Sequence, residues 1–391
     1  MGKQRNFTCI FPDAQNVHLI KDVGMIANVL GRTHGYDSHF VCLDRGREFS
    51  YLHEEAKWLR LDLIKDSPNY RQFRMAPFSA IRYLMDHAKD IDVLMLLNHT
   101  RETMILAAVY KLMNPYGFFY LKLDANEFWL EKECKKKHSS LVRAIYDYFP
   151  PHIFVRNIPN LITSESNRSC KNFLHIYPWG KEKTKVLPNG FDDVWFNENG
   201  LSDIVASDKD KLVISVGRIG TEQKNSEMLL NALESCDVGD WKIAFIGPIE
   251  DSFRRIIGNF YLKRPDLREK VLFVGEISDR LQLYSWYRRA MVFCITSRWE
   301  GFSLALVDAL HFGCHIVATQ VSSIDDVLDG GKIGKIVQSK EELKDYFEKV
   351  FSGCINPLDE FGCVRSFSNN FKWSYLCEKV ACWIAAEAER Y

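Results

Sequence analysis

The chain has 391 residues, of which 47% are hydrophobic and 26% are charged. This ordinary globular composition excludes a disordered, collagen-like or coiled-coil protein, and at roughly 100–200 residues per domain the length predicts about two or three domains. The 51 Lys and Arg residues balance the 51 Asp and Glu residues, so the chain lacks the basic excess of a typical nucleic-acid-binding protein.

The charges are divided unevenly along the chain. Residues 1–185 carry 27 basic and 20 acidic side chains, a balance of +7, whereas residues 186–391 carry 24 and 31, a balance of −7. The opposite signs suggest two domains with different surfaces.

The cysteine pattern and the lack of long apolar segments indicate in which cellular compartment the protein is found. Eleven cysteines are scattered without a C-x-x-C pair, which is typical of free thiols in a reducing environment. The first residues lack the apolar stretch of a signal peptide, and no window approaches the roughly 20 apolar residues of a membrane span. We expect a cytoplasmic protein, at most peripheral to the cytoplasmic membrane.

In the first half of the chain, short apolar runs alternate with amphipathic segments. Continuous apolar strands separated by helices are typical of a parallel sheet covered on both faces. In chain order, we expect a strand at 7–11, a helix at 23–32, strands at 38–43 and 92–97, a helix at 104–113, strands at 117–123 and 160–164, and a helix at 165–174.

The same alternation restarts after Pro188, Asn189 and Gly190. We therefore expect an α/β protein with two doubly wound, Rossmann-like domains, 1–188 and 189–370, followed by a closing helix at 371–391. The elements expected in the second half are strands at 211–216, 241–246, 271–274, 291–295 and 315–318, and helices at 226–234, 252–264, 281–289, 303–312 and 341–351.

The segment WLEKECKKKHSSLVRAIYDY at 129–148 gathers Lys132, Lys135, Lys136 and Lys137 beside apolar residues. It is read either as a solvated helix face or as a basic amphipathic surface that contacts an anionic lipid or acceptor.

An acidic motif follows the expected strand at 291–295. The loop carries Glu300, and a helix is expected to start near Ser303 and to end at Gly313, a typical C-cap. The backbone N–H groups of residues 301–303 would then form an anion site at a helix N-terminus, with Asp308 eight residues after Glu300. The alternative is a helix with ordinary surface acids.

A cationic loop follows the expected strand at 211–216. It places Arg218 and Lys224 six residues apart, directly before a helix. Arginine offers a planar fork for phosphate oxygens and lysine a compact charge, so the pair could neutralise a diphosphate. The alternative is a loop with two solvated cations.

Four segments occur in one order: VLPNGFDDVWF at 186–196, GRIGTEQKN at 217–225, FIGP at 245–248 and SRWEGFSLALVDAL at 297–310. Together they resemble retaining glycosyltransferases of the GT-B fold, in the large family four (glycosyl transferases group 1). The resemblance implies two Rossmann-like domains that face a central cleft, with the acceptor bound by the first and a nucleotide sugar by the second. It also implies that the C-terminal helix crosses back to the N-terminal domain.

The resemblance also implies roles for individual residues. Arg218 and Lys224 would hold the donor diphosphate, Glu300 would contact the transferred sugar, and Asp308 would bind the ribose, although it is one methylene shorter than the usual Glu. The other positions implied for the donor site are Gly24, Gly217, Gly247, Ile277, Gly301, Phe302, Ser303 and Leu304.

The N-terminal half matches the family less well. The loop after its first strand is not glycine-rich, and Gly24 is its closest equivalent. Asp124 stands where the family often has a histidine, and would contact the donor sugar or the acceptor hydroxyl, or else form a turn. His99 follows the strand at 92–97, and either contacts the acceptor or has a local packing role.

The resulting expectation is a metal-independent hexosyltransferase without a cofactor. Two D-x-D matches, at 90–92 and 208–210, precede expected strands and are interpreted as acidic turns. The donor would be a UDP- or GDP-linked hexose, and the acceptor a glycan hydroxyl, on a lipid-linked bacterial polysaccharide intermediate at the inner face of a membrane. The alternatives are a phosphorylase or epimerase of the same fold and a non-catalytic nucleotide-sugar-binding protein.

Overall fold

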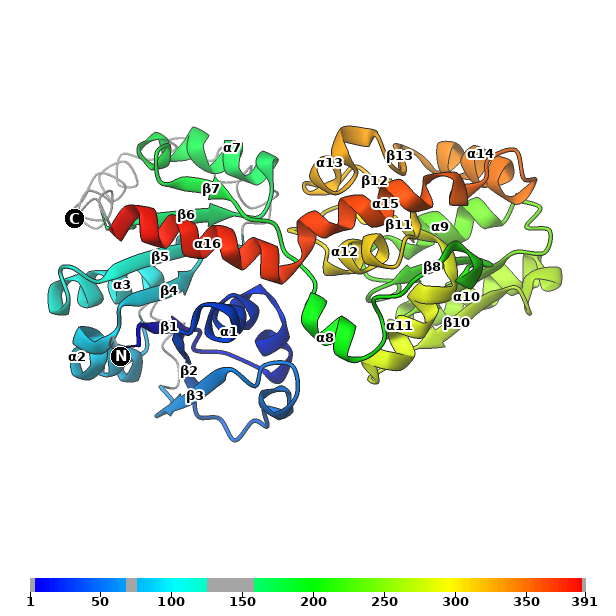
Figure 1. The fold of residues 1–391 in the computed structure, drawn as a ribbon. Coiled ribbons are helices and arrows are strands. Elements are labelled where there is room, and N and C mark those ends of the chain that lie inside the picture. The colour runs from blue at the N-terminus through cyan, green and yellow to red at the C-terminus, as the bar shows by residue number, and fades with distance from the viewer. Residues whose placement is uncertain (1–3, 68–75, 125–157, 389–391) are drawn as a thin grey trace, which may run out of the picture. The chain divides into compact units, whose positions relative to one another are not determined.

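The computed structural model describes residues 4–67, 76–124 and 158–388 (Figure 1). The basic segment at 129–148 lies outside these residues. The chain divides into two compact units, which are described separately: unit 1 contains Met1–Trp195 and Lys372–Tyr391, and unit 2 contains Phe196–Phe371. The boundary between them falls within the short helix α8 (Asp193–Glu198).

Unit 1 is built on one sheet, which within the described residues has seven strands in the order β3-β2-β1-β4-β5-β6-β7. Each pair of neighbours is parallel. The strands are β1 (Asn6–Ile10), β2 (Asp37–Leu43), β3 (Leu59–Ile64), β4 (Val93–Leu97), β5 (Phe118–Leu123), β6 (Leu161–Ser164) and β7 (Thr184–Val186).

Helices cover both faces of this sheet. On one face, α1 (Asp22–His34) and α16 (Trp373–Ala388) pack against each other and against β1, β4 and β5. On the other face, the apolar core includes side chains of α2 (Phe78–His87), α3 (Arg101–Met113) and α7 (Asn167–Ile176). Four large apolar side chains of α16 are almost fully buried in unit 1, so at roughly 1.5–3 kcal/mol each they join the C-terminal helix firmly to this unit. These are Trp373, Leu376, Val380 and Ile384.

Unit 2 repeats the architecture with, in the described residues, six parallel strands in the order β10-β9-β8-β11-β12-β13. The strands are β8 (Asp210–Val216), β9 (Lys242–Ile246), β10 (Val271–Gly275), β11 (Ala290–Ile295), β12 (His315–Thr319) and β13 (Lys335–Val337). The helices are α9 (Ser226–Leu233), α10 (Asp251–Lys263), α11 (Arg280–Arg289), α12 (Leu304–His311), α13 (Ile324–Val327), α14 (Lys340–Phe351) and α15 (Phe361–Ser368).

The expected α/β class with two doubly wound parallel sheets is confirmed. Every expected strand forms within one or two residues of its predicted bounds, but β3, β7, β13, α2, α13 and α15 were not predicted. The edge strand β3 alternates apolar and polar residues, unlike the continuous apolar runs of the inner strands. The helix predicted at 165–174 begins only at Asn167, because the Ser166 side chain caps it by accepting a hydrogen bond from the N–H of Ser169.

Both sheets reverse their strand order at one point, between β1 and β4 in unit 1 and between β8 and β11 in unit 2. In doubly wound sheets, ligands bind beyond the carboxyl ends of the strands at this topological switch point. The loops after β1, β4, β8 and β11 are therefore the places to examine for a functional site.

Candidate active site

In unit 2, the two motifs singled out in the sequence meet at the switch point. The cationic loop follows β8 and the acidic loop follows β11, two neighbouring strands. The N–H of Arg298 donates to the carbonyl of Gln223 over 2.8 Å, and the Thr296 hydroxyl donates to the carbonyl of Asn225 over 3.0 Å. The two loops are thus fixed to each other by backbone contacts.

The centre of this site is an ion pair between Lys224 and Glu300. The Lys224 Nζ lies 2.6 Å from Glu300 Oε1, and the two side chains are only 18% and 8% exposed. Glu300 also accepts hydrogen bonds from the Ser297 hydroxyl over 2.6 Å and from the Gln223 amide over 3.3 Å. A carboxylate with three donors is held in one orientation, with its charge compensated by the protein itself.

Two glycines allow the loops to approach this closely. Gly247, which follows β9, has φ +136°, and a Cβ there would lie 1.9 Å from the carbonyl oxygen of Gly217. Gly217 has φ +152°, and a Cβ there would lie 3.1 Å from Lys224 Cε. These two of the predicted donor-site glycines therefore hold backbone conformations and contacts that a side chain would disturb.

Helix α12 points its N-terminus at the end of the acidic loop. Leu304 is its first residue and Ser303 its N-cap, but the Ser303 side chain makes no capping hydrogen bond. The Ser322 hydroxyl donates to the carbonyls of Glu300 and Gly301, over 3.1 and 2.9 Å. These hydrogen bonds fix the backbone just before the helix begins. First-turn N–H groups that no side chain caps are suited to bind an anion.

The remaining predicted donor residues lie around this centre. Arg218 is exposed and donates to the Gln223 side-chain oxygen over 2.7 Å. Phe302 is buried, Gly301 is half-buried, and Ile277 lies half-buried in the loop between β10 and α11. Gln223 and Ser297 were not predicted as site residues, although both lie inside the quoted motifs, because no pattern distinguished them from other polar loop residues.

Asp308 lies on α12, one turn after Leu304. Desolvation raises the pKa of its carboxyl to about 7, and the positive charge of Arg280 opposes this rise. The carboxyl therefore changes charge near neutral pH, so the affinity for any ligand that contacts it would depend on pH. Its contact with a ribose stays a prediction.

In unit 1, local packing accounts for two of the predicted residues. Gly24 lies buried in the first turns of α1, and a Cβ there would lie 2.4 Å from the carbonyl oxygen of Leu19. The His99 ring packs against the tilted ring of Tyr177 with centroids 4.6 Å apart, and the Phe173 ring centroid lies 6.3 Å away. Close packing explains a glycine at 24 and a ring at 99, and the ligand roles of both stay predictions.

Asp124 is tied to the end of the neighbouring strand. Its N–H donates to the side-chain oxygen of Asn98 over 2.9 Å, and Asn98 adopts the left-handed conformation with φ +63°. Asn98 in turn donates its N–H to the carbonyl of Lys122 over 2.7 Å. The backbone of Asp124 is thereby fixed at the carboxyl edge of the sheet.

Beneath Asp124 lies a buried polar cluster that no sequence motif indicated. Lys122, fully buried, forms ion pairs with Asp22 over 2.9 Å and with Glu165 over 3.0 Å. The Asn189 amide donates to the same Glu165 oxygen over 2.8 Å. These residues come from α1, β5 and the segments after β6 and β7, so no short spacing in the sequence could reveal them.

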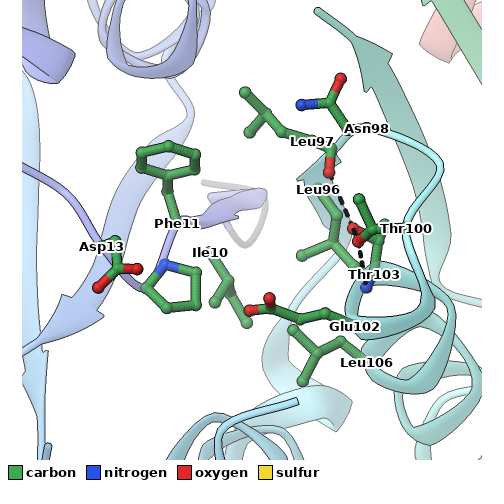
Figure 2. Close-up of a pocket in the computed structure, with 11 residues that line it drawn as sticks. Ile10, Phe11, Asp13, Leu96, Leu97, Asn98, Thr100, Glu102, Thr103 and Leu106 are labelled. Atoms are coloured by element: carbon green, nitrogen blue, oxygen red, sulfur yellow. Dashed lines mark hydrogen bonds between the residues drawn. The ribbon is translucent and has the colours of Figure 1, made fainter. Parts of the chain in front are cut away.

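A cavity of about 130 Å³ opens at the switch point of unit 1, between the ends of β1 and β4 (Figure 2). In Figure 2, Glu102 reaches from the first turn of α3 towards Ile10, and the Thr103 hydroxyl bonds to the carbonyl of Leu97 over 2.8 Å. The lining residues are Ile10, Phe11, Pro12, Asp13, Leu96, Leu97, Asn98, Thr100, Glu102, Thr103 and Leu106.

The described residues contain no group of three or more His, Cys, Asp or Glu side chains that could hold a metal ion. The acids of the two D-x-D matches have structural partners: Asp92 accepts from the N–H of Asn6, and Asp208 and Asp210 pair with Arg288 and Arg289. Among the helices that the structure describes, none has the length and apolar character needed to cross a bilayer.

Two doubly wound units with a charged switch-point site define the class of protein. The fold is that of the GT-B glycosyltransferases. HepE of Anabaena, whose structure was solved in complex with UDP, aligns with a TM-score of 0.71 at 16% identity over 97% of this chain and 100% of its own. A glycosyltransferase from Rickettsia africae aligns with a TM-score of 0.71 at 12% identity over all of both chains.

The sequence comparison finds a family match over part of the chain. Residues 199–357, most of unit 2, match the family described as glycosyl transferases group 1. The matched residues include the motifs at 217–225 and 297–310, on which the resemblance to this family was based.

Curated relatives are more distant. An enzyme of Campylobacter jejuni, named as an N-acetylgalactosaminyltransferase acting on a diphospho-undecaprenol-linked sugar, is 25% identical over 54% of each chain. CapH, a capsular polysaccharide biosynthesis glycosyltransferase of Staphylococcus aureus, is 23% identical over 64% of this chain and 65% of its own. The chain spans about half the length of the first of these relatives.

Proposed function

We propose that the protein is a retaining glycosyltransferase that moves a hexose from a UDP- or GDP-linked donor to a hydroxyl of a glycan. The observation that carries this proposal is the site at the β8–β11 switch point, where Lys224 and Glu300 lie 2.6 Å apart beside the start of α12. Unit 2 would bind the nucleotide diphosphate and the transferred sugar. The complex of HepE with UDP supports a uridine nucleotide.

The leaving group defines what the site must do. Negative charge grows on the diphosphate as the glycosidic bond breaks, so groups already oriented towards it lower the barrier. Lys224, Arg218 and the N–H groups at the start of α12 are such groups. Without donor, the negative charge of Glu300 compensates the positive charge of Lys224. When the donor binds, its phosphate pairs with Lys224 instead, and Glu300 is then free to accept hydrogen bonds from hydroxyls of the sugar. These cations supply the charge stabilisation, so the proposed reaction is metal-independent.

Retention requires attack on the face from which the nucleotide leaves. In the proposed reaction, the bond from the anomeric carbon to the phosphate oxygen breaks and a bond to the acceptor oxygen forms. The proton of the acceptor hydroxyl passes to an oxygen of the departing diphosphate, which gains negative charge during the same step. Exclusion of water from the site would limit hydrolysis of the donor.

We assign the acceptor to unit 1. The cavity at the β1–β4 switch point has carboxylate and amide groups at Asp13, Asn98 and Glu102, which suit the hydroxyls of a sugar. The name of the Campylobacter relative supports a lipid-linked acceptor, and the name of the Staphylococcus relative supports a role in making a capsular polysaccharide. Such an acceptor would bring the protein to the inner face of the cytoplasmic membrane, which flotation with anionic vesicles would test.

The test is nucleotide release from a panel of UDP- and GDP-sugars without acceptor, with Lys224→Met as the control. Slow hydrolysis of one donor that the variant loses would identify donor and site together. Release of sugar phosphate only when inorganic phosphate is added would indicate a phosphorylase. No release and no thermal stabilisation by any nucleotide would contradict the proposal and favour a non-catalytic protein.

A further inference from the structure

A second cavity lies in unit 2, at the end of the sheet opposite the loops that carry Lys224 and Glu300. It has a volume of about 460 Å³, which is within the range of small-molecule binding sites. The amino ends of β8, β9 and β10 and the last turns of α11 line it. At about 3.3 Å per residue, the length of β8 separates this cavity from the loop of Lys224 by about 20 Å. The cavity is therefore distinct from the proposed donor site.

The floor of the cavity is largely apolar. Leu212 of β8 and Lys242 of β9 are register partners, so both side chains point to one face of the sheet. Leu272 of β10, whose register partner is Ala244, points to the same face. Helix α11 adds the half-buried ring of Trp286. The Leu272 side chain is only half-buried, so this part of the sheet face is open to a ligand.

The rim of the cavity is charged. Arg289 pairs with Asp210 over 2.7 Å, and Lys211 pairs with Asp240 over 2.8 Å, so these four charges compensate one another. Lys242 also lines the cavity and is exposed, and its ammonium takes part in none of the ion pairs or hydrogen bonds of the described residues. The cavity therefore has one positive charge without a protein partner.

Three properties of this lining define the ligand. The indole ring of Trp286, with the Arg289 guanidinium 6.0 Å from its centroid, offers a flat apolar surface on which the C–H face of a sugar ring can pack. Hydroxyl groups both donate and accept hydrogen bonds, so they match a rim that contains both carboxylates and cations. The unpartnered ammonium of Lys242 favours a ligand with a negatively charged group.

We propose that this cavity binds a segment of an acidic glycan, with a sugar ring packed on Trp286 and a carboxylate of the glycan paired with Lys242. The inference rests on the proposed glycosyl transfer, because the glycan would be the growing acceptor chain, and it adds a second binding site for that chain. A chain held at two places keeps its reacting end at a high effective concentration. The site thus serves the retention of long acceptors and takes no part in the chemical step.

Binding of two tetrasaccharides to the full-length protein tests the site by calorimetry. The acidic probe is a hyaluronan tetrasaccharide, in which glucuronate alternates with N-acetylglucosamine, and the neutral probe is chitotetraose. The wild type should bind the acidic probe more tightly. Lys242→Gln should weaken the acidic probe alone, by up to about fivefold, and high salt should have the same effect because the ammonium is exposed. Trp286→Leu should weaken both probes at least about tenfold, because the packing surface is lost.

Matched variants control for changes elsewhere in the protein. Lys349→Gln removes an exposed lysine of α14, and Trp58→Leu removes a tryptophan of unit 1 that is 47% exposed. Both variants should bind the two probes as the wild type does. Melting curves establish that each variant is folded. Because Lys242 lies at the surface, Lys242→Gln decides the matter even where Trp286→Leu does not fold.

Donor hydrolysis separates this site from the proposed active site. Lys242→Gln and Trp286→Leu should release nucleotide from the donor at the wild-type rate, because the cavity lies about 20 Å from the loop of Lys224. A reduced rate in a folded variant would contradict the independence of the two sites.

Each binding result decides one part of the proposal. Equal affinity of the wild type for the two probes overturns the acidic ligand, and unchanged binding in both Lys242→Gln and Trp286→Leu overturns the cavity as the site. Inorganic phosphate that binds as tightly as the acidic probe, with no effect of Trp286→Leu, shows a simple anion site and excludes the sugar. A wild type that binds the acidic probe but hydrolyses no nucleotide sugar overturns the proposed function and leaves the glycan site standing. Hydrolysis without binding of either probe does the reverse.

Discussion

The ion pair between Lys224 and Glu300 can be tested by removing its cation and then its anion. In Lys224→Met, Glu300 keeps the donors Ser297 and Gln223 but loses the ammonium 2.6 Å away. A hydrogen bond to a charged group contributes about 1.5–3 kcal/mol, so we expect a loss of about 2 kcal/mol. For a unit of this size, the melting temperature should fall by about 4–8 °C.

Adding Glu300→Gln to this variant separates stability from catalysis. The amide removes the uncompensated charge, so the double variant should regain stability to within about 1 kcal/mol of the wild type. Donor turnover should stay about 10²–10³-fold low in both variants, because the cation proposed to stabilise the diphosphate is absent from each. Nucleotide release measures the turnover, and urea denaturation the stability.

The matched control is Lys211→Met. Lys211 pairs with Asp240 over 2.8 Å, but the two side chains are 55% and 69% exposed. An exposed pair contributes at most about 1 kcal/mol, so both stability and turnover should stay near wild type. The reasoning is refuted if Lys224→Met turns over donor at the wild-type rate, or if the double variant is as unstable as Lys224→Met alone.

Two further predictions concern unit 2. Gly247→Ala should destabilise the protein by at least about 2 kcal/mol in urea denaturation, because its Cβ would lie 1.9 Å from the Gly217 carbonyl oxygen. Gly258→Ala in α10, where a Cβ meets nothing within 4 Å, should stabilise it by about 0.5–1 kcal/mol; equal effects at both positions would contradict the argument. Burial raises the pKa of Asp308 to about 7, so below that pH its carboxyl is protonated and would accept hydrogen bonds from the proposed ribose less well. Nucleotide affinity measured by calorimetry should therefore weaken as the pH falls from 8 to 6, and Asp308→Asn should remove the trend; an unchanged trend in the variant would exclude Asp308 as its origin.

The parts of the proposed donor site could be predicted from the sequence because each of them is local. A strand, a short loop and a helix start occupy about fifteen consecutive residues, so Glu300 and the first turn of α12 are placed by chain connectivity alone. The same holds for Arg218 and Lys224 after β8. That these two loops meet follows from the strand order, since the loops after neighbouring parallel strands emerge at one edge of the sheet.

Other features of the donor site depended on side-chain packing. The pairing of Lys224 with Glu300, which the sequence assigned to different parts of the ligand, appears only once the loops are in contact. Gln223, a neighbour of the predicted cation, bonds to Glu300 and to the carbonyl of Trp299, and no pattern distinguished it from other polar loop residues.

By itself, the sequence determined the two parallel sheets, the resemblance to glycosyl transferases group 1 and the charged residues of the loops after β8 and β11, because hydrophobic periodicity and short motifs are properties of neighbouring residues. Only the tertiary structure decided the polar cluster of unit 1. Successive members of the set Asp22, Lys122, Glu165 and Asn189 are 24 to 100 residues apart along the chain, and the expected strand at 117–123 gave Lys122 no special role. Burial at one sheet edge makes their charges interdependent, and burial is a property of the folded chain.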